Sequence, residues 1–389
     1  MTGLFTYDGP MYRDRNGIYC NTYVTNQILN RFYSVVDKVV VLIRTFEIKG
    51  KYQELHLNKL ETSDRLEVVE LPNINSPVNY LTRWKYRKII ETVVDRCDMY
   101  FLRIPSVISD MVAEICYKKN KPYLVEVGGC SFDAYWNHNI TGRCIAPSMY
   151  LHQKKTVKNA SFASYVTTKW LQSRYPTNAE FSVSASNVYL TDFNENRVRI
   201  KANQWNEHKD VYTLGTIASY ETRYKGQHKI IEVLSRLKAK GIMLKYELVG
   251  GGDSSWLKGV AEKFGVSDQV VFHGLKKKEE VNAWLDTVDI YVQPSKQEGL
   301  PRSVIEAMNR GCVCLGSRKA GIPELLEEDE LFAPDDVKAM CERIEMVIGE
   351  KDAERRCLRN FEKSKRYSLD ILNDTRNTLF RAYKESLLH

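Results

Sequence analysis

QPSKQEGLPRSVIEAM, residues 293–308, follows the apolar run Ile290-Tyr291-Val292 and opens a pattern typical of an amphipathic helix. We expect a strand over 290–292 and a helix over 304–310. Pro301 fits the first turn of this helix, because its missing N–H would have no partner there. The amides at 302–304 then point out of the helix start, where the helix dipole favours an anion such as a diphosphate.

Two carboxylates accompany these amides. Glu298 lies just before them, and Glu306 follows within the helix. A carboxylate repels a phosphate, so it is better suited to accept hydrogen bonds from neutral sugar hydroxyls. The segment therefore predicts a site where a sugar and a diphosphate are bound side by side.

The alternation of short apolar runs and helical patterns extends along the chain in both directions. We expect further strands over 3–7, 39–43, 99–102, 123–127, 211–214, 246–249, 270–272 and 313–315. We expect further helices over 109–119, 230–240, 256–264 and 281–285. This rhythm is typical of parallel sheets with helices on both faces, an α/β class of fold. In such folds the ligand sites lie at the carboxyl ends of the strands.

Polar, turn-prone segments at 191–196 and 203–210 indicate a domain boundary near residue 200. We expect a first domain over residues 1–200 and a second over 201–367. A final helix over about 368–389 has one apolar stripe, and we expect it to pack back on the first domain.

The composition is that of a folded protein, with 43% hydrophobic and 27% charged residues among 389. Nine cysteines without paired spacing argue against a disulfide framework and a zinc ribbon, and indicate reduced thiols in a cytoplasmic protein. The first ten residues lack a signal-peptide pattern, and no run reaches the roughly 18–20 apolar residues that span a bilayer.

The net charge of +8 is uneven, because residues 1–200 carry +7 of it and residues 201–389 carry +1. The densest point is Arg83-Trp84-Lys85-Tyr86-Arg87-Lys88, where aromatic and basic side chains alternate. This cluster suits peripheral contact with an anionic membrane or lipid, and a solvated helix face is the alternative. Nucleic acid is a weaker candidate, since no recognition motif is visible.

The string EGLPRSVIEAM (298–308), with Pro294-Ser295 before it and Gly321-Ile322-Pro323-Glu324 after it, resembles the retaining glycosyltransferases of glycosyltransferase family 4. The similarity extends over about residues 211–330 and fades towards both ends. It implies the GT-B fold, in which two Rossmann-like doubly wound domains face each other across a cleft. A capped amphipathic helix with incidental glutamates is the alternative.

The resemblance implies that Glu298 contacts the transferred sugar and that Glu306 binds the ribose hydroxyls of the nucleotide. It implies that the following residues line the rest of the donor site: Gly215, His273, Gly274, Leu275, Gly299, Leu300, Pro301, Arg302 and Ser303. The backbone at 273–275 would lie against the base, so the sequence does not name the base. His273 by itself is as well explained by a local hydrogen bond.

A second matching element is Leu214-Gly215-Thr216 followed by Arg223-Tyr224-Lys225-Gly226. Gly215 at the end of a strand would let a ligand approach closely. Lys225 fits the family's lysine and would neutralise the diphosphate. The family often has an arginine where this chain has Thr216, and Arg223 is our candidate for the missing charge. Surface charges are the alternative for both cations.

The acceptor side of the site is expected in the first domain. In the family the first strand-to-helix loop is glycine-rich, and Asn16 and Gly17 occupy the matching place. Arg13 and Arg15 beside them would suit an anionic acceptor, or be exposed loop cations. Arg103, at the end of a strand, and the segment 126–129 are further candidates.

The resemblance implies transfer of a sugar from a nucleotide diphosphate sugar, with retention of configuration and without a metal or other cofactor. No DxD-type carboxylate pair lies where a metal-bound diphosphate would need it. The partners would be the sugar donor and a sugar acceptor, which a lipid could carry. We expect a role in bacterial surface polysaccharide assembly, such as capsule, O-antigen or exopolysaccharide. The alternatives are a nucleotide-sugar epimerase or another GT-B enzyme, a transferase acting on a protein or small molecule, and a non-catalytic binding protein.

Overall fold

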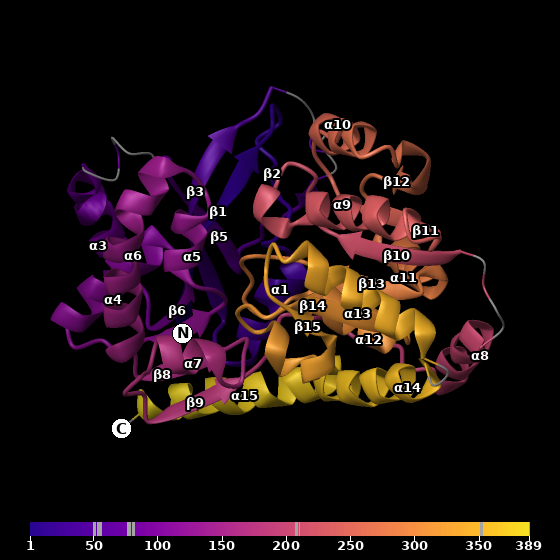
Figure 1. Cartoon of the computed structure of the whole chain (residues 1–389). Helices are drawn as coiled ribbons and strands as arrows, with labels where there is room; N and C mark the ends of the chain where they lie inside the picture. The colour runs from indigo at the N-terminus through magenta and orange to yellow at the C-terminus, as the bar shows by residue number, and fades with distance from the viewer. Residues whose placement is uncertain are drawn as a thin grey trace. The chain divides into compact units, whose positions relative to one another are not determined.

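The computed structural model describes residues 1–49, 52, 57–75, 79, 82–206, 209, 211–350 and 353–388. The chain forms two compact units (Figure 1). Unit 1 comprises Met1–Ala185 and Leu372–His389, and unit 2 comprises Ser186–Ile371. Over the described part of the chain, no helix is both long and apolar enough to cross a bilayer.

Over the described residues, the sheet of unit 1 has nine strands. Seven of them are parallel, in the order β5-β3-β1-β6-β7-β8-β9, and the antiparallel strands β2 and β4 extend the sheet beyond β1. The strands are β1 (Thr2–Arg13), β2 (Tyr19–Asn21), β3 (Lys38–Glu47), β4 (Asn58–Lys59), β5 (Leu66–Leu71), β6 (Met99–Ile104), β7 (Leu124–Val127), β8 (Phe162–Tyr165) and β9 (Phe181–Ser184). Strand order reverses between β1 and β6, as in a doubly wound fold.

Both faces of this sheet are covered because successive strand residues alternate between them. Val40 and Leu42 of β3 face a layer made of α3 (Arg87–Asp95), α4 (Val107–Lys118), α6 (Ile140–Lys158) and α7 (Trp170–Arg174). Val39 and Val41 face α1 (Asn26–Asn30), η1 (Arg31–Ser34) and α15 (Leu369–Ser386). The short helices η3 (Arg83–Tyr86) and α5 (Ser131–Trp136) precede α3 and α6.

The C-terminal helix α15 completes the core of unit 1. Its Phe380 and Tyr383 are fully buried, and both rings lie against Phe101 of β6. The Tyr383 hydroxyl donates to the carbonyl of Pro122 at 2.7 Å and accepts from the backbone N–H of Tyr100 at 3.0 Å. The helix ends at Ser386, and His389 lies outside the described residues.

The first loop of unit 1 differs from our expectation. We expected a strand over 3–7 and then a strand-to-helix loop, but β1 runs on to Arg13 and pairs with β2 as a hairpin. The Asp14 carboxylate accepts from the backbone N–H of Asn16 and of Ile18, both at 2.9 Å. Gly17 has φ +75°, a left-handed conformation that glycine adopts without strain. Asn16 and Gly17 therefore form a hairpin turn, and predicting a strand-to-helix loop was wrong.

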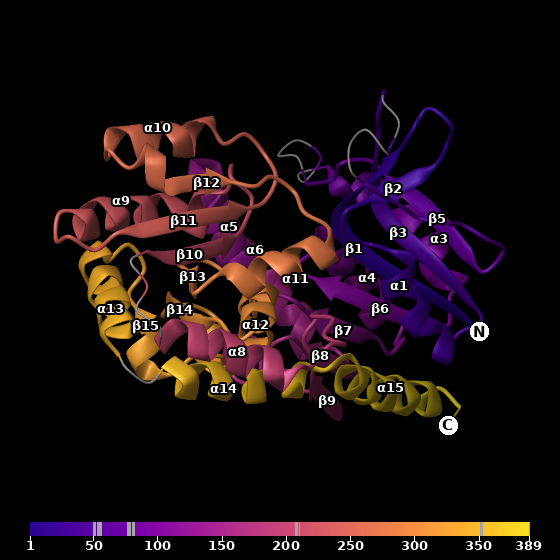
Figure 2. The same ribbon diagram turned by 90° about the vertical axis from the view of Figure 1, so that its right-hand side faces the viewer.

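Unit 2 has an all-parallel sheet in the order β12-β11-β10-β13-β14-β15, which is the doubly wound order (Figure 2). The strands are β10 (Tyr212–Ile217), β11 (Leu244–Val249), β12 (Val270–Phe272), β13 (Ile290–Gln293), β14 (Val313–Ser317) and β15 (Leu331–Phe332). The helices are α8 (Glu195–Asn206), α9 (Gln227–Lys238), α10 (Ser255–Lys263), α11 (Lys278–Thr287), α12 (Arg302–Asn309), α13 (Val337–Gly349) and α14 (Ala353–Ser364). Short 3₁₀ turns lie at η4 (Arg223–Lys225), η5 (Ser267–Gln269), η6 (Ile322–Glu324), η7 (Glu328–Glu330) and η8 (Lys365–Tyr367).

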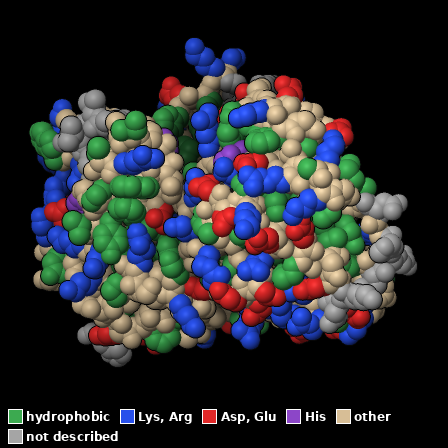
Figure 3. Space-filling view, in the orientation of Figure 1, with side chains coloured by type: hydrophobic (Ala, Val, Ile, Leu, Met, Phe, Trp, Pro, Cys, Tyr) green, Lys and Arg blue, Asp and Glu red, His purple; other side chains and the backbone are tan. Residues whose placement is uncertain are grey.

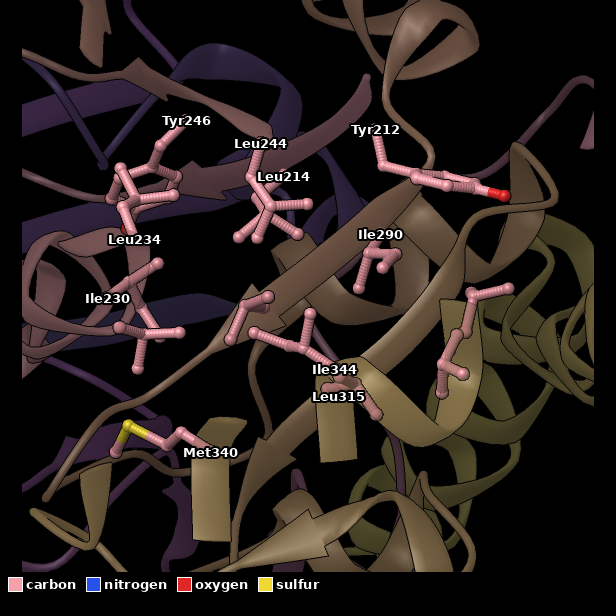
Figure 4. Close-up of a cluster of buried hydrophobic side chains, with 14 of the residues drawn as sticks. Tyr212, Leu214, Ile230, Leu234, Leu244, Tyr246, Ile290, Leu315, Met340 and Ile344 are labelled. Atoms are coloured by element: carbon pink, nitrogen blue, oxygen red, sulfur yellow. The ribbon is translucent and has the colours of Figure 1, made fainter. Parts of the chain in front are cut away.

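The core of unit 2 joins the central strands to α9 and α13. Figure 4 shows Leu214 and Ile290 of the sheet with Ile230 of α9 and Ile344 of α13. Helix α8 contributes Val198 and Ala202 to the same core. The predicted boundary at residue 200 is therefore about 15 residues too late, because burial of α8 assigns it to unit 2. The predicted end at 367 lies four residues before the observed one.

Candidate functional site

The site of unit 2 is built where its strand order reverses. β10 and β13 are neighbours at the centre of the sheet, yet the chain leaves them towards opposite edges. The loops after their carboxyl ends therefore meet with no connection crossing between them. These two loops carry Lys225 and Glu298.

A salt bridge joins the two loops. The Lys225 Nζ lies 2.7 Å from the Glu298 Oε1, and the Glu298 side chain is only 10% exposed. The same Oε1 accepts from the Gln293 Nε2 at 2.9 Å. The Glu298 side chain is thus fixed in direction by two contacts, one to Lys225 and one to Gln293.

Gln293, the last residue of β13, is a residue that our sequence analysis did not single out. Its Nε2 also donates to Ser295 at 2.8 Å, and its Oε1 accepts from Tyr291 at 2.9 Å and from Ser303 at 3.2 Å. Every polar atom of the amide is therefore used, which fixes its orientation. The sequence does contain a signal for this residue, because Gln293 is polar and directly follows the apolar run Ile290-Tyr291-Val292.

The loop that carries Lys225 is pressed against the end of β13. Gly226 has φ +79°, and a Cβ added there would lie 2.3 Å from the carbonyl oxygen of Pro294. The backbone N–H of Lys296 donates to the carbonyl of Tyr224 at 2.8 Å. A side chain at position 226 would force this backbone apart, and the close approach holds the Lys225 loop beside the loop that carries Glu298.

Helix α12 starts beside this pair. We expected Pro301 in its first turn, but Pro301 is the residue before the helix, with ψ 113°, because the loop reaches it in an extended conformation. No side chain caps the helix among the described residues, so its first amides at Arg302 and Ser303 remain suited to an anion. The Gly299 carbonyl accepts from Gly321 at 2.9 Å and ties the two glycine segments together. Leu300 is buried.

Glu306 lies in α12 with its side chain 18% exposed, and it forms an ion pair with Lys278, the first residue of α11. Our sequence analysis did not identify this partner, because 28 residues separate Lys278 from Glu306 in the chain. Lys278 neutralises the carboxylate that we expect to accept hydrogen bonds from a ribose.

Gly215 and Arg223, which we expected at the donor site, have other contacts in the structure. Gly215 is the fourth residue of β10 rather than its end, and a Cβ there would lie 2.7 Å from the Val288 side chain. Core packing, not close approach of a ligand, therefore accounts for this glycine. Thr216 beside it is fully buried and donates to the Val292 carbonyl at 2.7 Å. Arg223 lies over the ring of Trp256 at 4.8 Å, a cation–π contact.

His273 follows β12, and its Nε2 lies 2.9 Å from the Glu247 carboxylate. Trp284 donates to that carboxylate at 2.7 Å, and Lys245 pairs with it at 2.6 Å. Burial alone would raise the pKa of Glu247, but these three donors lower it. His273 therefore has a local structural partner. Gly274 has φ +72°, and the Leu275 side chain after it is exposed.

In unit 1, Arg103 lies in β6 beside Glu126 of β7, with the Arg103 Nε 3.3 Å from the carboxylate. Arg31 binds both oxygens of Glu126 at 2.6 Å. Burial alone would raise the pKa of Glu126, but the arginines hold it below its usual range. The predicted residues Asn16 and Gly17 are in the hairpin turn. Arg13 beside them pairs with Glu47 and Glu70.

Within the described ranges, no group of three or more His, Cys, Asp or Glu residues could hold a metal ion. Metal independence itself stays a prediction.

Comparison with known proteins gives a family match, one relative that aligns over nearly its full length and one that aligns over a shorter segment. The model of the family "Glycosyl transferases group 1" matches residues 198–364. Protein CapJ of Staphylococcus aureus is 31% identical over 391 residues, which cover 98% of this chain and 95% of CapJ. The amylovoran biosynthesis glycosyltransferase AmsK of Erwinia amylovora is 35% identical over 115 residues, 28% of each chain.

Solved structures show the same fold at low sequence identity. Sucrose-phosphate synthase from Thermosynechococcus elongatus has a TM-score of 0.68 at 14% identity, covering 99% of this chain and 100% of that one. HepE of Anabaena in complex with UDP has a TM-score of 0.66 at 15% identity, covering 98% and 100%.

Proposed function

Because the chain belongs to the glycosyl transferases group 1 family and has the GT-B fold, we propose that it is a retaining enzyme that uses a nucleoside diphosphate sugar. The observation that carries the proposal is the Lys225–Glu298 pair at the start of α12. A lysine, free helix amides and a fixed carboxylate meet there, and these are the groups that a diphosphate and a sugar need.

In the proposed reaction the bond between the anomeric carbon and the diphosphate oxygen breaks. A new bond forms from the acceptor oxygen to the same face of the sugar. The acceptor proton passes to the leaving diphosphate. Lys225 and the amides of Arg302 and Ser303 stabilise the charge that grows on the diphosphate. No metal takes part in this scheme.

Glu298 acts on the sugar rather than as a nucleophile. Lys225 and Gln293 both bind its Oε1, which turns the carboxylate into a rigid acceptor for sugar hydroxyls. Glu306 binds the ribose hydroxyls, and its ion pair with Lys278 holds the side chain in place for that role. Arg223 lies over the Trp256 ring, and in this proposal its positive charge acts on the diphosphate from a longer distance.

The acceptor is proposed to belong to a bacterial surface polysaccharide, such as capsule, O-antigen or exopolysaccharide. The biosynthetic name of AmsK and the full-length similarity to CapJ support this proposal. The basic charge of the first 200 residues suits an acceptor carried on a lipid diphosphate, with the enzyme at the inner face of a membrane. In this proposal Arg103 lies near the acceptor and the Arg83–Lys88 cluster contacts the lipid surface.

Calorimetry with a panel of nucleoside diphosphates tests the donor site, followed by turnover with the matching sugar donors. We expect one base to bind at least ten-fold more tightly than the others. Proton NMR of the first-formed product then reads its anomeric configuration. Inversion of configuration would overturn the retaining mechanism, and binding of no nucleotide would overturn the donor site itself.

A further inference from the structure

Unit 1 exposes large apolar side chains on one of its two helical layers. Ile140 and Leu151 of α6 are 79% and 64% exposed, Trp136 of α5 is 43% exposed, and Trp84 of η3 is 68% exposed. Isolated surface leucines are common, but several large apolar side chains on one layer mark an interaction site.

The pattern of α6 shows that this exposure is not a packing defect. Met149 and Val157 point into the core of unit 1, so the helix already has a buried apolar face. Ile140 and Leu151 lie on the opposite, outer face, where globular proteins normally place polar residues. The helix is therefore apolar on two faces.

The charged residues of α6 all have one sign. The sequence ITGRCIAPSMYLHQKKTVK contains Arg143, Lys154, Lys155 and Lys158 and no aspartate or glutamate. All four cations are exposed, and none has an ion-pair partner among the residues that the structure describes. An outer face with cations beside exposed aliphatic groups is the composition of an interfacial helix.

Aromatic rings extend this face onto α5. Trp136 stacks on Phe132 with ring centroids 5.2 Å apart, and the Arg143 guanidinium lies 5.8 Å from the Trp136 ring. An indole beside a guanidinium is typical of side chains that lie at the level of lipid headgroups. Figure 3 shows hydrophobic and basic side chains interspersed on this part of unit 1.

The topology places this face at the ligand edge of the sheet. β7 ends at Val127, α5 begins four residues later, and α6 starts at Ile140. The N-terminal end of α6 therefore lies near the carboxyl ends of the strands, where doubly wound sheets bind their ligands.

From these observations we infer that the outer face of α5 and α6 docks on an anionic lipid bilayer. Ile140, Leu151 and Trp136 enter the headgroup region, while Arg143, Lys154 and Lys155 contact lipid phosphates. The Arg83–Lys88 cluster is a secondary part of this contact, because Arg87 is already paired with Glu114 at 3.2 Å. Only the link to a lipid-carried acceptor rests on the proposed function, since docking itself needs no catalysis.

Sedimentation with vesicles tests the inference on the full chain without any activity measurement. Wild type should bind vesicles of equal phosphatidylglycerol and phosphatidylcholine at low salt, and bind pure phosphatidylcholine at least ten-fold more weakly. Ile140→Ser with Leu151→Ser should lower binding by about ten-fold or more, because each large aliphatic side chain adds roughly several-fold to partitioning. Lys154→Glu with Lys155→Glu should lower binding by on the order of 30-fold, since each cation contributes roughly five-fold.

The matched controls are Ile200→Ser and Lys338→Glu in unit 2. Ile200 is 61% exposed, so it tests the loss of an exposed isoleucine elsewhere, and Lys338 tests the loss of an exposed lysine. Both should bind vesicles as wild type does. Lys85→Glu with Lys88→Glu should weaken binding less than the α6 pair. Circular dichroism and nucleotide affinity show that each variant remains folded.

Three outcomes would overturn the inference. Wild type could ignore anionic vesicles at low salt, or the α6 variants could bind as tightly as the controls. Alternatively, sedimentation velocity could show a dimer that the Ile140 and Leu151 substitutions dissociate while vesicles stay unbound, which would assign the face to a second copy of this chain. Nucleotide affinity that survives any of these results would leave the proposed donor site standing.

Discussion

The Lys225 ammonium lies 2.7 Å from the Glu298 carboxylate, although 73 residues separate them in the chain. The contact exists because β10 and β13 are neighbours at the point where the strand order of unit 2 reverses. Each residue alone could be a surface charge. Their pairing at this edge places both at one candidate site.

Lys225→Ala should lower turnover more than it lowers affinity for a nucleoside monophosphate. Its charge would act on the distal phosphate, where negative charge grows in the transition state. Steady-state kinetics and calorimetry with mono- and diphosphates measure the two effects. Lys338→Ala, an exposed lysine of the same unit, is the control. Equal losses for both ligands would reduce Lys225 to a general binding contact.

Glu306→Ala should weaken nucleoside diphosphate binding by about ten-fold or more, because a charged hydrogen bond contributes roughly 1.5–3 kcal/mol. Lys278 would also lose its partner. Glu279→Ala, one residue along α11 from Lys278 and exposed, should bind as wild type does. Unchanged affinity in a folded Glu306→Ala protein would contradict the ribose assignment.

Chelation by EDTA should leave transfer activity largely intact. In the proposed reaction Lys225 and the first amides of α12 neutralise the leaving diphosphate, so no step needs a divalent cation. Initial rates with and without EDTA measure this. A complete loss of activity that Mg²⁺ or Mn²⁺ restores would contradict metal independence.

Gly226→Ala should destabilise the protein and lower nucleotide affinity, while Gly241→Ala should affect stability alone. Both glycines have φ +79°, so both substitutions strain the backbone by about 1 kcal/mol. Only at Gly226 does the added Cβ meet a neighbour, the carbonyl oxygen of Pro294 at 2.3 Å.

Urea unfolding and calorimetry on both variants separate the two contributions. The Gly226 variant should lose clearly more unfolding free energy than the Gly241 variant, and it should also bind nucleotide more weakly. Identical behaviour of the two would show that the loop reaches Glu298 without this contact.

The strands and helices of unit 2 could be predicted well, because each is encoded by a pattern within a short stretch of sequence. Short β-branched runs and 3.6-residue periodicity recur between residues 211 and 317, and the observed strands and helices lie within a few residues of the expected ones. The motif at 293–308 also led us to Glu298 and Glu306 as candidate site residues, and that assignment stays a prediction. Their partners Gln293 and Lys278 were missed, because ion pairs and hydrogen bonds between loops depend on the order of strands in the sheet.

Unit 1 was harder to predict. Asn16-Gly17 is a strong hairpin signal, but we placed it by resemblance in a strand-to-helix loop. The turn chemistry of Asp14 and Gly17 decided the structure instead. Gly215 shows the reverse case, in which a glycine of a matching motif is required by core packing.

Because most of α15 belongs to unit 1, the core of unit 1 cannot be completed until the end of the chain has been synthesised. Residues 1–185 leave the ribosome first. The rings that pack against Phe101, those of Phe380 and Tyr383, emerge almost 200 residues later. Unit 2 is one continuous segment and can fold as soon as it is translated. The first segment of unit 1, in contrast, leaves Phe101 without its α15 partners until translation ends. During that interval we expect a chaperone to bind the nascent chain at this exposed aromatic surface.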